Sequence, residues 1–153
     1  MIVVLDAGPL GLVTNPRATP ESLRCKQWLV DLLAGGVRVV VAEITDYEVR
    51  RELLRAGRTR GITHLDQFKR AANYLPITTD AMLLAAQFWA DARRHGSPTA
   101  PDLALDADVI LAAQAILLAQ QEQDTVVIAT TNVGHRSRYT PANLWRDIYP
   151  PSP

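Results

Sequence analysis

The stretch Met1–Leu10, MIVVLDAGPL, decides the fold. The apolar run from Ile2 to Leu5, mostly β-branched, leads directly into Asp6, and the turn-forming pair Gly8-Pro9 follows. A short, continuous apolar run of this kind is typical of a parallel strand that is covered on both faces. The pattern predicts a buried strand over residues 2–6 that carries a carboxylate at its carboxyl end.

The rest of the chain alternates between similar runs and amphipathic segments. Residues 37–41 and 124–130 are two further β-branched runs, and residues 145–148 are a weaker candidate for a short strand. Helical spacing of apolar residues, with good capping and stop signals, predicts helices over residues 19–35, 43–56, 61–75, 79–96 and 106–121. Because strands alternate with helices and no linker divides them, we expect one α/β domain over residues 1–153.

Bulk composition narrows the function classes without selecting one. Lys plus Arg equals Asp plus Glu at 16 each, so any nucleic-acid binding must come from local patches. No apolar run approaches the roughly 20 residues that span a bilayer, and the first residues lack the charged segment of a signal peptide. A lone cysteine, Cys25, excludes an internal disulfide. We therefore expect a cytoplasmic protein with no membrane partner.

Acidic residues follow the carboxyl ends of the first two predicted strands. Asp6 follows the first, where capping of a short helix near Pro9 is the alternative role. Glu43 and Glu48 follow the second, and Glu48 could point across the crevice that open α/β sheets form beyond their strands. The alternative for Glu48 is a solvated side chain paired with a nearby arginine.

Polar residues recur further along the chain. Asp106 is a candidate N-cap, whereas Asp108 would lie in the first turn of a helix rich in Ala, Leu and Ile. Such a carboxylate is partly desolvated and favours a nearby cation. Thr130 and Asn132 come at the end of the third strand. Four polar strand or helix ends in one small domain are more than capping requires.

Clustered carboxylates without His or Cys neighbours have a definite chemistry. Their mutual repulsion in a low dielectric is relieved by a shared cation, and oxygen ligands select hard ions such as Mg²⁺ or Mn²⁺. A bound ion of this type orients and activates water and stabilises a leaving oxygen. The residues therefore suit hydrolysis of phosphodiesters.

Four stretches together resemble the PIN domain, the ribonuclease fold of VapC-type toxins. They are VVLDAGPL (3–10), YEVRREL (47–53), DADVILAAQA (106–115) and IATTN (128–132), in the family's order and at fitting separations. The resemblance implies a PIN-like three-layer α/β/α fold with a short central parallel sheet flanked by helices. It also implies a Mg²⁺- or Mn²⁺-dependent endoribonuclease, the toxin of a toxin–antitoxin pair.

The resemblance assigns roles residue by residue. Asp6, Glu48 and Asp108 become the catalytic and metal-binding acids, with Glu43 as the second choice for the glutamate. Asn132 takes a position that is often Asp in the family, so it brings an oxygen but no charge. Asp106 becomes an auxiliary metal ligand. As partners, the resemblance implies an RNA substrate, a small antitoxin and a second copy of the chain in a homodimer.

Basic side chains near these acids are the candidates for binding RNA phosphates. The stretch RRELLRAGRTR, residues 50–60, is rich in arginine, and arginine binds phosphate through two parallel hydrogen bonds. Arg51, Arg55 and Arg136, with Thr130, are the predicted substrate-binding residues. An ordinary solvated helix end is the alternative for the first two. A groove between the helices over residues 19–35 and 43–56 would suit the antitoxin.

Two other functions fit parts of the same sequence. A domain with this fold and a weak or inactive site could bind RNA or protein without cleaving it, because Asn132 is uncharged. A phosphatase with Asp6 as nucleophile is disfavoured, since haloacid-dehalogenase-like phosphatases have a second Asp two residues on, where this chain has Gly8.

Overall fold

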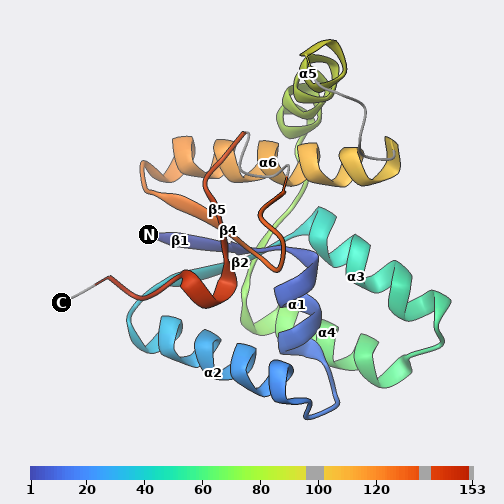
Figure 1. Ribbon diagram of the computed structural model, residues 1–153, viewed down its shortest axis with the longest axis vertical. Coiled ribbons are helices and arrows are strands. Elements are labelled where there is room, and N and C mark those ends of the chain that lie inside the picture. The colour runs from blue at the N-terminus through green and yellow to red at the C-terminus, as the bar shows by residue number, and fades with distance from the viewer. Residues whose placement is uncertain (96–101, 135–138, 152–153) are drawn as a thin grey trace.

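The computed structural model describes residues 1–95, 102–134 and 139–151, and a parallel sheet forms its centre (Figure 1). The strand order is β3-β2-β1-β4-β5. The strands are β1 (Ile2–Leu5), β2 (Arg38–Ala42), β3 (Asn73–Leu75), β4 (Val126–Thr130) and β5 (Ala142–Leu144). Strand β1 is central, and Val4 lies level with Val40 on one side and Ile128 on the other. The three strands predicted from apolar runs are confirmed.

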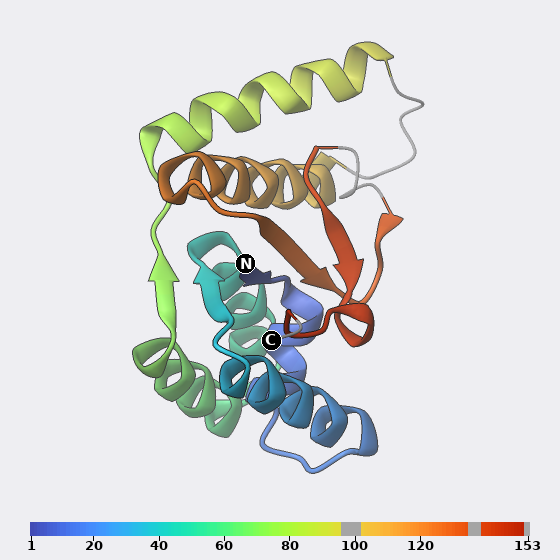
Figure 2. The same cartoon turned by 90° about the vertical axis from the view of Figure 1, so that its left-hand side faces the viewer.

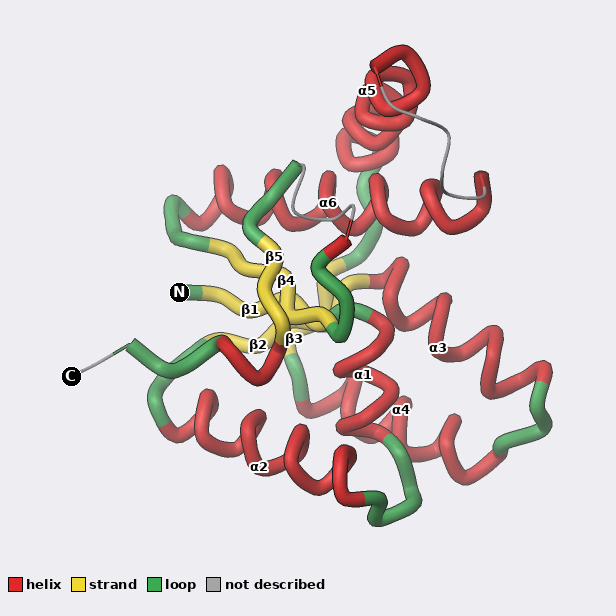
Figure 3. The backbone as a smooth tube through the Cα atoms, viewed as in Figure 1, coloured by secondary structure: helices red, strands yellow, loops and turns green. Residues whose placement is uncertain are grey.

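Helices cover both faces of the sheet (Figures 2 and 3). They are α1 (Ala7–Thr14), α2 (Pro20–Ala34), α3 (Glu43–Arg55), α4 (Thr59–Ala71), α5 (Thr79–His95) and α6 (Asp102–Glu122), with a 3₁₀ turn η2 (Trp145–Asp147). Side chains alternate along β1: Val3 and Leu5 pack with α1, α2 and α4, whereas Ile2 and Val4 pack with α6. This alternation confirms the predicted three-layer α/β/α fold.

Two of the predicted elements near the strands are wrong. The helix expected over residues 61–75 ends at Ala71, and Asn73–Leu75 form β3, because the free edge of β2 pairs with them. The side-chain amide of Asn73 also donates to the Val39 carbonyl at 3.1 Å. The strand expected over residues 145–148 is a 3₁₀ turn, since the preceding residues pair with β4 instead. Its Trp145 packs edge-on against Trp28 at 5.6 Å between ring centroids.

Helix boundaries also differ at three starts. Helix α4 begins at Thr59, two residues earlier than predicted. Helix α6 begins at Asp102, one turn earlier than predicted, because Leu105 is buried against α5 and extends the helix toward its N-terminus. Asp106 is therefore not an N-cap, and Asp108 lies in the second turn. Helix α5 is capped by Thr78, whose hydroxyl accepts from the Ala81 amide at 3.1 Å, and not by Thr79. The predicted Thr19 cap of α2 is confirmed.

The single cysteine has a packing role. Cys25 is fully buried in the core between α1 and α2, and burial raises the pKa of its thiol to about 12. A thiol with that pKa stays protonated and unreactive near neutrality. None of the helices in the described ranges is long and apolar enough to cross a bilayer.

A charge network fixes α4 onto α3. Asp46, 6% exposed, accepts two hydrogen bonds from the Arg50 guanidinium, the shorter at 2.8 Å, and one from Lys69 at 3.3 Å. Arg50 also binds Asp66 at 2.7 Å, and this guanidinium lowers the pKa of Asp66. Arg50 is thereby held away from any substrate, although its neighbours in sequence are candidates for phosphate binding.

Removing the charge of Asp46 should destabilise the fold. Asp46→Asn removes a carboxylate that both Arg50 and Lys69 contact. We expect the unfolding free energy to fall by about 2 kcal/mol. This is less than for a fully buried ion pair, because Arg50 is partly exposed. Glu52→Gln is the matched control, since it breaks an exposed ion pair with Arg55 on the same helix and should change stability by under about 0.5 kcal/mol. Urea denaturation compares them, and equal effects would contradict the role of the network.

Candidate active site

Asp6 is buried at the carboxyl end of the central strand. Because Leu5 pairs with Val41 and Ala129, Asp6 comes level with the ends of both neighbouring strands. Its side chain caps α1 by accepting from the Ala7 amide at 2.8 Å. Its other oxygen accepts a 2.6 Å hydrogen bond from the Thr130 hydroxyl at the end of β4. The predicted alternative role of Asp6, capping of α1, is therefore confirmed. The cap uses only one of the two carboxylate oxygens.

Thr130 orients this carboxylate. It has no exposed surface, and its hydroxyl also accepts from the Asn132 amide at 3.1 Å. The single hydroxyl proton goes to the nearer, charged acceptor, Asp6, because charge-assisted hydrogen bonds are the stronger ones. Such burial favours a positioning role for Thr130 over direct contact with a substrate. Asn132 is exposed beside it.

A glycine permits the close approach of α1 to the segment after β4. A Cβ atom on Gly8 would lie 2.5 Å from the Thr131 hydroxyl oxygen, so only glycine fits without displacement. Thr131 lies between Thr130 and Asn132. Gly8 therefore lets the start of α1 and the end of β4 share one corner, a requirement that the Gly-Pro turn signal did not reveal.

Helix α3 presents two glutamates with different surroundings. The Glu43 carboxylate accepts the Ile77 amide at 2.6 Å and is thereby held by the segment after β3. Glu48, half-buried, lines a shallow depression of about 380 Å³ together with Ala7, the residue after Asp6. Of the two choices that the sequence left open, Glu48 is the one that faces the Asp6 end of α1.

Helix α6 brings Asp108 toward the same end of the sheet. Ala107 is buried in the same apolar cluster as Ala42 and Ile44, where β2 passes into α3, and α6 contacts α3. Asp108, next to Ala107, is half-buried. In Figure 1 the N-terminal half of α6 lies over the start of α3, with α1 below. Asp106 is exposed.

The acids lie toward the same end of the sheet without forming a compact ligand set. Across residues 1–95, 102–134 and 139–151, no three Asp, Glu, His or Cys side chains are close enough together to hold one metal ion. Mg²⁺ usually takes one or two direct carboxylates and keeps several waters. A buried carboxylate oriented by Thr130, with two further acids bound through water, is compatible with that preference, and all the donors are hard oxygens.

Two of the predicted phosphate-binding arginines lie in the described residues, and each makes only a surface contact. Arg55 pairs with Glu52 at 2.7 Å, and the Arg51 guanidinium lies 5.3 Å from the centre of the Tyr47 ring. Both are exposed, so either could exchange these weak surface contacts for phosphate. Arg136 lies outside the described residues.

The expected groove between the helices over residues 19–35 and 43–56 has a different form. Helix α1 packs against both α2 and α3 and lies between them (Figure 1). The pocket on this side is lined instead by the end of α1, the residues after it, α3 and the start of α4. Sequence reasoning missed this pocket because its walls come from three stretches that are separate in the sequence: residues 11–17, residues 49–53 and residues 57–61.

Loss of the Thr130 hydroxyl should destabilise the site corner. Thr130→Val keeps the shape but removes a donor from the buried Asp6 carboxylate, and we expect a loss of about 2 kcal/mol in unfolding free energy. Thr14→Val is the control, because its buried hydroxyl donates to the neutral Leu10 carbonyl at 2.7 Å, and it should cost under about 1 kcal/mol. Thermal or urea unfolding measures both. A Thr130→Val protein no less stable than Thr14→Val would show that the carboxylate does not depend on this bond.

Comparison with solved structures identifies the fold of this chain. No protein-family model and no curated protein matches the chain. A chain of VapBC2 from Rickettsia felis, crystallised with a DNA fragment from its promoter, superposes with a TM-score of 0.68 at 16% identity, covering 95% of this chain and 99% of that one. A chain of VapBC-1 from nontypeable Haemophilus influenzae gives 0.67 at 17% identity, covering 96% and 100%. The PIN-like fold that the four motifs predicted is thereby confirmed.

Proposed function

We propose that this protein is a Mg²⁺- or Mn²⁺-dependent endoribonuclease that hydrolyses RNA phosphodiester bonds, and that it is the toxin of a toxin–antitoxin pair. The observation that carries the proposal is the buried Asp6 carboxylate, held by Thr130 and by the first amide of α1 at the carboxyl end of the sheet. Glu48 and Asp108 flank the same end. The likeness to two VapBC structures supports the toxin class.

Each acid has a distinct part in the proposal. Asp6 is the direct metal ligand, because Thr130 fixes its rotamer and a carboxylate accepts about four hydrogen bonds or ligands in all. Glu48 and Asp108 complete the negative charge around the ion, directly or through water, and Asp106 and Asn132 are auxiliary ligands. Bound here, the ion would supply an activated water and charge stabilisation for the leaving oxygen.

The partners follow from the same class. The two similar structures are VapBC complexes by name, so we propose an antitoxin partner, and a homodimer with a cytoplasmic location completes the proposal. RNA is the proposed substrate because the flanking helix α3 carries exposed arginines within one or two turns of Glu48.

Neutralising the central acids should abolish cleavage. We expect Asp6→Asn and Asp108→Asn to lower the rate of Mg²⁺-dependent RNA cleavage at least 100-fold, because each removes a charge that binds the ion. Gel analysis of a labelled RNA measures the rate, and circular dichroism checks that each variant is folded. Asp91→Asn, on the exposed side of α5, is the matched control and should keep full activity.

Two outcomes would contradict the mechanism. Cleavage that persists in both folded variants would exclude a metal site built on these acids. Calorimetry with Mn²⁺ that detects no binding to the unmodified protein, together with no cleavage, would indicate an RNA- or protein-binding module instead of a nuclease.

The two glutamates of α3 provide a second test. Glu48→Gln should lower cleavage at least 100-fold, whereas Glu43→Gln should leave it within about threefold, because glutamine retains the acceptor that binds the Ile77 amide. Measuring both rates at saturating Mg²⁺ separates the two candidates. The reverse pattern would assign the role of the metal-binding glutamate to Glu43 instead of Glu48.

A further inference from the structure

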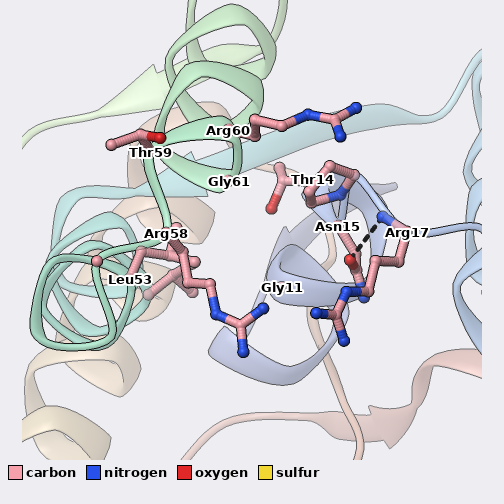
Figure 4. A pocket seen from close by; sticks show the side chains of 12 residues that line it. Gly11, Thr14, Asn15, Arg17, Leu53, Arg58, Thr59, Arg60 and Gly61 are labelled. Carbon is pink, nitrogen blue, oxygen red and sulfur yellow. Dashed lines mark hydrogen bonds between the residues drawn. The ribbon is translucent and has the colours of Figure 1, made fainter.

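A pocket of about 560 Å³ lies beside the proposed active site, and arginine dominates its charge. Arg17 comes from the segment after α1, and Arg58 and Arg60 from the start of α4, and the three side chains surround the same opening (Figure 4). No aspartate or glutamate lines it. The pocket is therefore a concentrated positive patch on a chain whose formal net charge is zero.

These three arginines differ from the other arginines nearby. Arg50 and Arg55 bind the carboxylates of Asp46 and Glu52. Within the described ranges, no carboxylate lies in ion-pair distance of Arg17, Arg58 or Arg60. All three are exposed and can turn their guanidinium groups toward a ligand.

The walls of the pocket let a bulky anion approach the backbone. Gly11, Gly57 and Gly61 are among its lining residues, and a Cβ atom on Gly11 or Gly57 would meet nothing within 4 Å. Helix α4 begins here at Thr59, and Arg58 supplies no side-chain cap. The first amides of α4 thus add a positive helix end to the three guanidinium groups, although the arginines carry the argument.

The pocket adjoins the depression that Glu48 lines. Val49, Leu53 and Arg58 belong to both. From Glu48 to the end of α3 at Arg55 the helix rises roughly 10 Å, at about 1.5 Å per residue. A strand that left the acidic crevice along α3 would therefore reach the arginines within a few nucleotides.

We infer that this pocket binds the phosphate backbone of single-stranded RNA a few nucleotides from the bond that is cleaved. The inference rests on the proposed function and adds to it a second, purely binding site. Arginine binds phosphate bidentately, and three arginines from two segments fit successive phosphates better than a single carboxylate. The position beside the Glu48 depression favours RNA over an acidic protein segment, because only the substrate must extend out of the proposed active site.

Metal-free binding tests the pocket apart from catalysis. Anisotropy of a labelled 12-nucleotide single-stranded RNA in EDTA compares the unmodified protein with the triple variant Arg17→Gln, Arg58→Gln, Arg60→Gln. We expect roughly 10- to 100-fold weaker binding, and a slope of log affinity against log salt that is smaller by about 2, at about 0.7 for each lost contact to single strands. In Mg²⁺, KM should rise while kcat stays within about twofold.

The control removes the same charge elsewhere. Arg70→Gln, Arg94→Gln, Arg146→Gln changes exposed arginines on α4, α5 and η2 and should leave affinity within about threefold. If the two triple variants bind RNA equally and the unmodified protein still cleaves RNA, the pocket is not an RNA-binding site, and the proposed nuclease function is unaffected. Pocket-dependent binding of polyglutamate but not of RNA would assign the pocket to a protein and overturn the inference. Absence of both RNA binding and cleavage in the unmodified protein would instead remove the proposed function, and the inference with it.

Discussion

The hydrogen bond between the Thr130 hydroxyl and the Asp6 carboxylate is the constraint on which the proposed site depends. It joins the ends of β1 and β4 at 2.6 Å in a corner with almost no solvent access. A carboxylate buried to this degree is costly unless donors surround it. The first amide of α1 and Thr130 supply two donors, and Gly8 lets α1 approach closely enough for the corner to close.

The charged residues of helix α3 have two kinds of role: some bind neighbouring elements of the fold, and others lie on the surface. Asp46 and Arg50 face α4 and lock the two helices together, and Glu43 holds the segment after β3. Glu48, two residues from each of Asp46 and Arg50 and therefore on another side of the helix, lines the depression beside Ala7 instead. This division explains why the arginine-rich stretch could not be assigned as a unit: helical periodicity turns adjacent residues in different directions. Arg50 is structural, Arg55 is held in a surface pair, and Arg58 lines a pocket beyond the helix.

The sequence predicted the parts of the fold that rest on local pattern. Apolar runs located β1, β2 and β4, and the Thr19-Pro20 signal located α2. It failed at β3, a three-residue strand that exists only because the edge of β2 pairs with it. It failed again at the start of α6, where burial of Leu105 against α5 extends the helix. For the site, the strand ends indicated Asp6 and Thr130. The hydrogen bond between their side chains joins residues 124 positions apart in the sequence, so it depends on the tertiary fold and not on a local pattern. The pocket of Arg17 and Arg58 was missed for the same reason.

The acids at the carboxyl end of the sheet and the arginine pocket are two adjoining regions of opposite charge. Arg58 lines both the pocket and the depression that Glu48 lines, so the two regions meet at that residue. A small anion would be drawn to the pocket and a small cation to the acids, and neither would engage both. A polyanion that brings a cation to one of its phosphates interacts favourably with both, so the layout suits a single-stranded nucleic acid better than any small ligand.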